Sequence, residues 1–201
     1  MKATSGSTPL VAGIFVGGRG SRLGGIAKGL LKAPDSDTTL VERLLQQLAR
    51  AAPDAEIVLV GSAEAYAKLG LPALSDAPAG VGPLGGLLGL LDYAAARGAR
   101  FALALSCDLP RLNAAILMRL ARENPELGAL VTEQAGVRNP LIARYAVAEA
   151  LPAARQVLSG GARSLQAVLD ALGPGVAALP LTGAEQALLG DWDTPQDVRL
   201  R

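Results

Sequence analysis

The sequence predicts an α/β fold with a mostly parallel, three-layer arrangement of sheet and helices, and three observations support this. Short apolar runs alternate with helical patterns along the first half of the 201-residue chain. Half of the residues are hydrophobic but only 3% are aromatic, so Ala, Leu and Val must form a core of helices packed closely on a sheet. Two adjoining strand patterns in the second half predict an antiparallel strand or hairpin. The length suits a single domain over residues 1–201.

In the first half, the apolar runs predict strands at 10–16, 56–60, 71–76 and 101–108. Helical patterns between and after them predict helices at 39–52, 63–70, 83–98 and 113–124. Thr39 and Glu42 have the spacing of a capping box, and Pro83 suits the first turn of a helix. This alternation favours parallel strands joined by helical crossovers.

The order changes in the second half. Residues 128–145 have the pattern of two strands around a turn near Ala135 and Gly136. A helical region at 146–172 and a last strand at 176–180 follow. The sheet is therefore expected to contain an antiparallel strand.

Charge and composition exclude several classes of protein. The 19 basic and 18 acidic side chains give a net charge of +1, which provides no broad basic field for nucleic acid or an anionic membrane. The absence of His excludes a histidine metal site and a Cys–His pair, and the single cysteine, Cys107, cannot form an internal disulfide. We expect a cytoplasmic protein with no nucleic-acid or membrane partner.

A glycine-rich loop follows the first predicted strand, within VGGRGSRLGGIAKGLL at 16–31. Glycines let backbone N–H groups turn toward an anion, and Arg19, Arg22 and Lys28 could neutralise phosphate oxygens. The loop is not a P-loop, because Lys28 follows Ala27 rather than Gly. It predicts a polyphosphate cradle, with a flexible surface turn as the alternative.

Acidic residues follow two other predicted strands. Ligands of such sheets bind outside the carboxyl ends of the strands, so Asp76 and Asp108 are expected to share one crevice with the loop. Asp108 is the expected Mg²⁺ ligand, although a helix cap near Asn113 or a solvated strand-end acid would also fit it. Asp191 or Asp193 could share the ion, but both also suit the start of a terminal helix.

This inventory suits nucleotidyl transfer. A phosphate monoester that attacks the α-phosphorus of a nucleoside triphosphate is already anionic and needs no general base. It needs alignment, Mg²⁺ and cations that offset charge repulsion. We expect Lys28, Arg22 and Asp108 to carry the reaction.

A rival interpretation rests on a G-x-G-x-x-G pattern at Gly80, Gly82 and Gly85, which would bind a dinucleotide in an oxidoreductase. The preceding strand pattern is weak, and Pro83 removes an N–H group from the turn that should hold pyrophosphate. The pattern also leaves the cationic loop unexplained.

Five segments occur in the order found in molybdenum cofactor guanylyltransferases of the MobA type, and the chain resembles that family over nearly its whole length. They are FVGGRGSRLGGIAKGLL, LSDAPAGVGPLGGLLGLL, FALALSCDLPRL, NPLIARY and DWDTPQD. The resemblance implies a Rossmann-like nucleotidyltransferase fold that joins GMP from GTP to the phosphate of molybdopterin, with Mg²⁺ as cofactor and pyrophosphate as product. It implies a nucleotide-binding half at 1–112, an acceptor-binding half at 113–201, and transient contact with cofactor-delivery or acceptor proteins.

The resemblance also implies a role for each matching residue. Nucleotide contacts through the backbone are implied at Phe15, Val16 and Gly17. Phosphate binding is implied at Gly18, Arg22 and Lys28. Asp76 matches an acid near the nucleotide, Asp108 matches the acid that binds Mg²⁺ and GTP, and Asn139 and Pro140 lie in the segment expected near the pterin.

Two departures from the family pattern keep alternatives open. Ala27 stands where members usually have Asp, and VLVGSA at 58–63 replaces an Asn-rich segment that helps to define the base pocket. Asp76 could still accept hydrogen bonds from the N1–H and amino group of guanine. Cytidylyl transfer to the same cofactor and a non-catalytic nucleotide-binding homologue stay possible.

Overall fold

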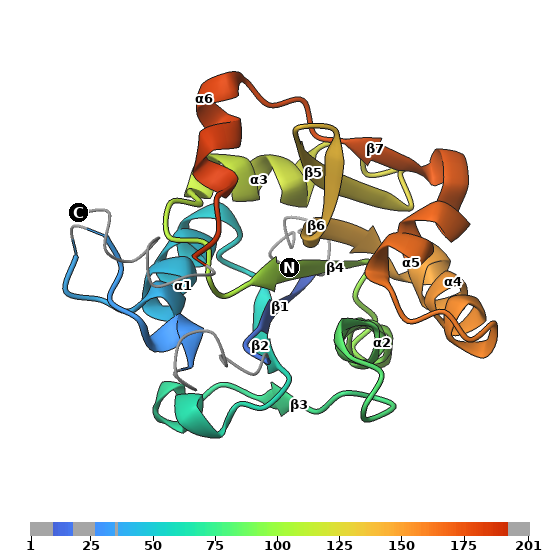
Figure 1. Ribbon diagram of the computed structural model, residues 1–201, viewed down its shortest axis with the longest axis horizontal. Coiled ribbons are helices and arrows are strands. Elements are labelled where there is room, and N and C mark those ends of the chain that lie inside the picture. Colours follow the sequence, from blue (N-terminus) through green and yellow to red (C-terminus); the bar gives the residue numbers. More distant parts are fainter. Residues whose placement is uncertain (1–9, 18–26, 35, 193–201) are drawn as a thin grey trace, which may run out of the picture.

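The computed structural model describes residues 10–17, 27–34 and 36–192, and these form one seven-stranded sheet between two helical layers (Figure 1). The strand order is β3-β2-β1-β4-β6-β5-β7. The strands are β1 (Leu10–Phe15), β2 (Glu56–Val60), β3 (Ala73–Leu74), β4 (Phe101–Ser106), β5 (Ala129–Gln134), β6 (Val137–Ala146) and β7 (Val176–Ala178). Only β6 runs antiparallel to both of its neighbours, β4 and β5, which confirms the mostly parallel sheet and the hairpin predicted from the sequence.

The α-helices are α1 (Leu40–Ala51), α2 (Pro83–Ala96), α3 (Ala114–Arg122), α4 (Val147–Ser159), α5 (Leu165–Leu172) and α6 (Gly183–Gln186). The 3₁₀ helices are η2 (Lys28–Leu30), η3 (Glu64–Leu69), η4 (Gly173–Gly175) and η5 (Ala187–Leu189). Thr39 and Glu42 form the predicted capping box at the start of α1, and Pro83 begins α2 as expected.

Alternate residues along the strands build two apolar cores, one on each face of the sheet. On β4, Ala102 and Ala104 face α2, α4 and α5, whereas Leu103 and Leu105 face α1 and α3. Helix α2 is apolar on nearly all of its faces, and eight of its fourteen residues are buried. The small side chains of the sheet let this helix pack closely, as the low aromatic content predicts.

Several boundaries differ from the sequence-based ones for local reasons. The helix expected at 63–70 is the 3₁₀ helix η3, and the marginal strand at 71–76 is only the two residues of β3. The helical region 146–172 divides into α4 and α5, because Gly161 adopts a φ of +84° and the Ser164 side chain caps α5.

The strand order reverses between β1 and β4. From β1 the chain passes to β2 and then β3 on one side, and β4 returns to pair with the other side of β1. In open α/β sheets the ligand crevice lies at this reversal, outside the carboxyl ends of the two strands. Val16 and Gly17, which follow β1, and the residues after β4 are therefore at the position where a ligand is expected.

No helix in the described part of the chain is both long enough and apolar enough to cross a membrane.

Candidate active site

Lys28 and Asp108, which are 80 positions apart in the sequence, form an ion pair at the reversal of strand order. The Lys28 Nζ donates a hydrogen bond of 3.0 Å to Asp108 Oδ2. Their side chains are 24% and 11% exposed, so the pair is shielded but open to a ligand. The loop lysine and the strand-end aspartate, which were expected to lie close together, are therefore in direct contact.

Two groups besides Lys28 hold Asp108 in place. The Ser106 hydroxyl donates to its other carboxylate oxygen, Oδ1. The N–H of Trp192 donates to the Asp108 carbonyl over 3.0 Å and brings the segment of Asp191 beside it. Asn113 caps α3 itself, with its side chain accepting from the N–H of Ile116, so α3 does not use Asp108 as its cap.

Tyr66, Gly29 and Cys107 meet directly behind the ion pair. The Tyr66 hydroxyl accepts the Gly29 N–H over 3.1 Å and is only 2% exposed as a residue. Burial first, and then the nearby Asp108 charge, raise the pKa of the Cys107 thiol to about 12. Burial also raises the pKa of Tyr66 above its ordinary value. The Cys107 and Tyr66 side chains are therefore both neutral near pH 7.

The backbones that follow β1 and β2 touch each other. The N–H groups of Val16 and Gly17 both donate to the Val60 carbonyl, over 3.0 and 3.3 Å. Gly61 has a φ of +100°, and a Cβ on it would lie 2.8 Å from the Gly17 Cα. Glycine is therefore required at Gly61 for this contact. Phe15 ends β1, and its carbonyl accepts the N–H of Cys107.

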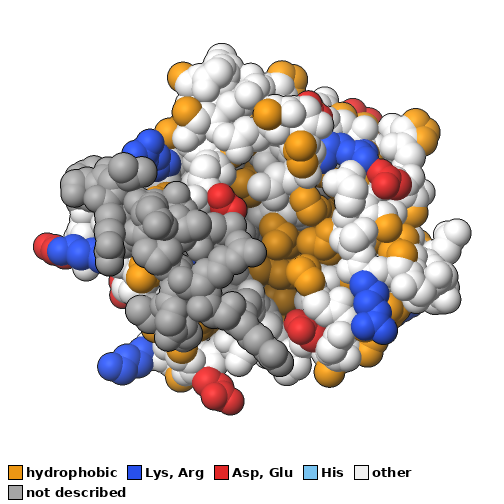
Figure 2. All heavy atoms as spheres, viewed as in Figure 1, with side chains coloured by type: hydrophobic (Ala, Val, Ile, Leu, Met, Phe, Trp, Pro, Cys, Tyr) orange, Lys and Arg blue, Asp and Glu red, His pale blue; other side chains and the backbone are white. Residues whose placement is uncertain are grey.

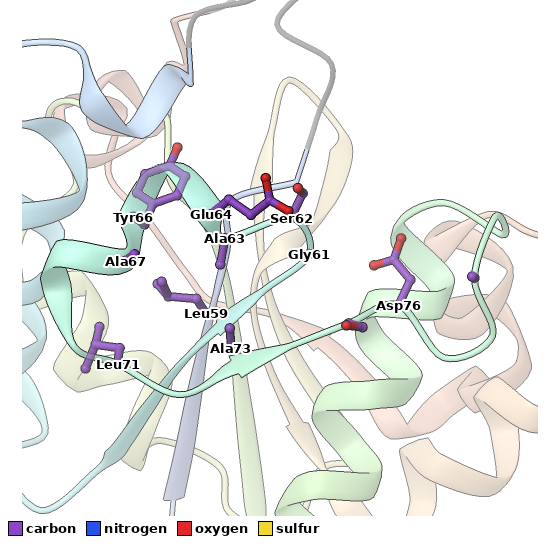
Figure 3. Close-up of a pocket in the computed structure, with 12 residues that line it drawn as sticks. Leu59, Gly61, Ser62, Ala63, Glu64, Tyr66, Ala67, Leu71, Ala73 and Asp76 are labelled. Atoms are coloured by element: carbon purple, nitrogen blue, oxygen red, sulfur yellow. The ribbon is translucent and has the colours of Figure 1, made fainter.

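A pocket of about 650 Å³ lies at the carboxyl ends of β2 and β3, a size typical of small-ligand sites (Figure 3). Asp76 stands on one side of it and Tyr66, on η3, on the opposite side, with Ser62 and Glu64 between them at the rim. The pocket thus contains Asp76, expected near a nucleotide, and residues of the altered 58–63 segment.

The glycine pattern after β3 serves packing and turn geometry. Gly80 and Gly82 have φ values of +79° and +67° with open space around them. A Cβ on Gly85 would lie 2.6 Å from the Pro78 carbonyl, and one on Gly86 would lie 3.4 Å from Asp76 Oδ1. These glycines let the segment that carries Asp76 lie against α2. A dinucleotide fingerprint follows the first, central strand of a βαβ unit. Here the preceding strand is β3, a two-residue strand at the edge of the sheet, so the glycine pattern does not form such a fingerprint.

Asn139 and Pro140 lie at the same edge of the sheet as Asp108. Because β6 is antiparallel to β4 and Leu105 pairs with Ile142, the residues before Ile142 extend past the end of β4. The β5–β6 register shifts here, from Val131 opposite Ala143 to Thr132 opposite Asn139, which is an irregularity where proline is tolerated. The Tyr145 hydroxyl donates to the Pro140 carbonyl over 2.8 Å and fixes this bulge.

Some predicted site residues lie outside the described residues. These are Gly18, Arg19, Arg22 and Asp193. Two contributors, Tyr66 and Ser106, were missed by the sequence analysis, which interpreted 63–70 only as a helix and gave Ser106 no role beyond its place in a strand. Tyr66 is one of three tyrosines in a chain with few aromatic residues, which is a weak signal for it. No signal in the sequence indicated that Ser106 contacts Asp108.

The described residues fit one Mg²⁺ ion that would be held by the Asp108 carboxylate and, for the most part, by the phosphates of a bound substrate. Mg²⁺ is usually held by one or two carboxylates together with substrate phosphates and water. Asp108 supplies one nearly buried carboxylate that already bears a cationic partner, Lys28. The described residues contain no cluster of three or more acidic, Cys or His side chains, so no all-protein metal cage is present among them.

The face drawn in Figure 2 is hollowed near its centre, where hydrophobic side chains gather with acidic ones at the rim.

Curated relatives are similar to this chain over most of its length. A probable molybdenum cofactor guanylyltransferase from Opitutus terrae is 29% identical over 197 residues, which cover 96% of this chain and 95% of that protein. A protein of the same description from Mycobacterium tuberculosis is 30% identical over 162 residues, which cover 80% of each.

Solved structures share the fold. Molybdopterin-guanine dinucleotide biosynthesis protein A from Archaeoglobus fulgidus superposes with a TM-score of 0.70 at 22% identity and covers 94% of both chains. A 2-C-methyl-D-erythritol 4-phosphate cytidylyltransferase from Thermus thermophilus has a TM-score of 0.65 at 19% identity, covering 94% of this chain and 96% of that one. The family model described as the MobA-like NTP transferase domain matches residues 12–175. The chain therefore belongs to the MobA-like NTP transferase family and is a nucleotidyltransferase.

Proposed function

We propose that this protein is a Mg²⁺-dependent guanylyltransferase that transfers GMP from GTP to the phosphate of molybdopterin and releases pyrophosphate. The observation that carries the proposal is the ion pair of Lys28 and Asp108 at the strand-order reversal. On one side of this pair lies the pocket with Asp76, and on the other lies the β6 segment with Asn139. The names of the curated relatives support the same reaction.

The pocket supports guanine as the base. Its described lining offers oxygen acceptors on Ser62, Glu64, Ser75 and Asp76, and none of its described lining residues is Asn, Gln, Lys or Arg. Guanine presents N1–H and amino donors side by side, which suit a carboxylate acceptor. The edges of cytosine and adenine each place a ring acceptor beside the amino group, and a carboxylate repels that acceptor. We therefore assign the pocket to the guanine nucleoside.

The residues around the ion pair suit transfer of the α-phosphoryl group. In this proposal Lys28 binds the triphosphate and offsets the repulsion between two anionic reactants. Asp108 would hold Mg²⁺, which when bound neutralises charge on the triphosphate. The acceptor phosphate is already anionic at neutral pH, so no residue has to remove a proton from it. Alignment of the two substrates is then the main task of the protein.

The acceptor side is assigned to the second half of the chain. In this proposal residues 1–112 bind the nucleotide and residues 113–201 bind molybdopterin, with Asn139 and Pro140 near the pterin. The irregular pairing of β5 and β6 leaves Asn139 and Pro140 beyond the end of β4, at the same edge of the sheet as Asp108, which supports their assignment to the acceptor side. Contact with cofactor-delivery or acceptor proteins and the cytoplasmic location stay predictions.

The test compares four nucleotides and one acceptor. Calorimetric titration with GTP, CTP, ATP and UTP in the presence of Mg²⁺ is expected to show the tightest binding for GTP. Addition of molybdopterin should then release pyrophosphate from the GTP complex. Preference for CTP would point to cytidylyl transfer, and tight GTP binding without turnover would point to a non-catalytic nucleotide-binding protein. Either result would contradict the proposal.

A further inference from the structure

We propose that Tyr66 is a positioning residue that holds the Lys28 turn in place for the triphosphate and ties that turn to the nucleoside pocket. The inference rests on the proposed function for the identity of the ligand. It goes beyond that function because it assigns a role to a residue that no part of the proposed reaction uses.

The first observation is a long-range hydrogen bond between the Tyr66 hydroxyl and the backbone of the Lys28 turn. The Tyr66 hydroxyl accepts the N–H of Gly29, the residue directly after Lys28, over 3.1 Å. Both groups are buried, so the loss of this acceptor would leave a backbone donor without a partner away from water. The bond therefore fixes the first turn of η2, and with it the backbone from which the Lys28 side chain extends.

The second observation is the tight fit between Gly29 and its surroundings. A Cβ on Gly29 would lie 2.9 Å from the Tyr66 hydroxyl oxygen, 3.0 Å from its ring and 3.3 Å from the Cβ of Cys107. Glycine lets the turn approach the Tyr66 ring and the end of β4 together. Since Asp108 follows Cys107, this contact also sets the distance from the turn to Asp108.

The third observation is that Tyr66 contacts both the nucleoside pocket and the Lys28 turn. Tyr66 is one of the η3 residues that line the pocket on the side opposite Asp76, while its hydroxyl reaches the turn behind the ion pair (Figure 3). A nucleoside in the pocket would lie against η3, the helix that carries the side chain holding the Lys28 turn. Tyr66 can therefore couple the position of the base to the position of the lysine that meets the phosphates.

Tyr66→Phe removes the hydroxyl and keeps the buried ring in place. We expect the Kd for GTP in Mg²⁺ to rise about 3- to 10-fold, the worth of one hydrogen bond, while the Kd for guanosine stays within about twofold. Tyr93→Phe is the matched control, because the Tyr93 hydroxyl donates to Glu56 at the opposite end of the strands. The control should bind GTP as the wild type does.

A double-mutant cycle separates positioning from a merely structural effect. In a Lys28→Ala background, Tyr66→Phe should change the Kd for GTP by less than about twofold, because the group that it positions is absent. Equal loss of GTP and guanosine binding would overturn the inference, since Tyr66 would then only form the pocket wall. Additive losses in the cycle, or wild-type GTP binding by Tyr66→Phe, would overturn it as well.

Hydrogen exchange tests the positioning without any nucleotide. Peptides that contain Gly29 and its neighbours in η2 should exchange faster in Tyr66→Phe than in the wild type or in Tyr93→Phe. Unchanged exchange would refute the role of the hydroxyl even if GTP binds. If the wild-type protein binds no GTP, the proposed function fails, and this measurement still decides whether Tyr66 holds the turn.

Discussion

Replacing Asp108 by Asn removes one negative charge from the candidate site and keeps the shape of the side chain. In the folded protein Asp108 Oδ2 lies 3.0 Å from Lys28 Nζ, and the two side chains are 11% and 24% exposed. At that distance two unit charges attract by about 5 kcal/mol at an effective dielectric constant of about 20. The cost of removing both charges from water offsets much of this. We expect the free energy of unfolding to fall by about 1 to 2 kcal/mol, between the values for exposed and buried pairs.

The effect on turnover should be much larger than the effect on stability. Loss of the carboxylate removes the proposed Mg²⁺ ligand and leaves the charge of the triphosphate poorly balanced, so we expect pyrophosphate release to fall at least about 100-fold. That is about 2.7 kcal/mol in the activation barrier. The assay measures pyrophosphate release with GTP, Mg²⁺ and molybdopterin, and urea unfolding of the same samples measures stability.

Asp92→Asn is the matched control for this variant. Asp92 accepts a hydrogen bond of 2.6 Å from Arg155 on the outer surface of α2 and α4. The same chemical change there should cost less than about 1 kcal/mol and leave turnover unchanged. If Asp108→Asn keeps wild-type turnover, or loses no more than Asp92→Asn does, the assignment of Asp108 to the metal and triphosphate is wrong.

Three further predictions concern stability and reactivity. Leu103 is fully buried on β4, so Leu103→Ala should lower the free energy of unfolding by about 3 kcal/mol in urea titrations, and a loss below about 1 kcal/mol would contradict the packing. Burial raises the pKa of the Cys107 thiol to about 12, so at pH 8 it is protonated, and an aromatic disulfide reagent should label it only after unfolding. Hydrogen bonds from the backbone N–H and then the hydroxyl of Thr39 lower the pKa of the Glu42 carboxyl. The stability that these bonds give the folded protein is therefore fully present above the ordinary pKa of a glutamate, and it is lost as the pH falls through the lowered pKa of Glu42. Thr39→Ala removes the hydrogen bonds of the hydroxyl and keeps the backbone N–H, so it should lower the Tm at pH 7 and lower it less in acid, where equal losses would refute this account.

Local sequence signals predicted the secondary structure well. The capping box of Thr39 and Glu42, the helix start at Pro83 and the turn at Ala135 and Gly136 all occur as expected. Each of these depends on residues within a few positions of one another. The least accurate prediction was the short helix at 63–70, whose 3₁₀ form cannot be separated from an α-helix by an apolar pattern of that length.

The candidate site was only partly predictable. The strand-end rule placed Asp76 and Asp108 at one edge, because parallel strands end on the same side of a sheet. It could not say that the Ser106 hydroxyl contacts Asp108, or that the carbonyl of Asp108 accepts the N–H of Trp192. Those contacts depend on side-chain direction and on where a distant segment crosses the edge.

The amino-acid sequence by itself determined the strand and helix pattern, the helix caps and the residue types at the carboxyl edge, since periodicity and local hydrogen bonding act over a few residues. Only the tertiary structure decided that Tyr66 lies behind Lys28, with its hydroxyl on Gly29. It also decided that Lys28 reaches Asp108, 80 positions away. Strand order and register set these contacts, and both arise from the packing of the whole sheet between its two helical layers rather than from any one segment.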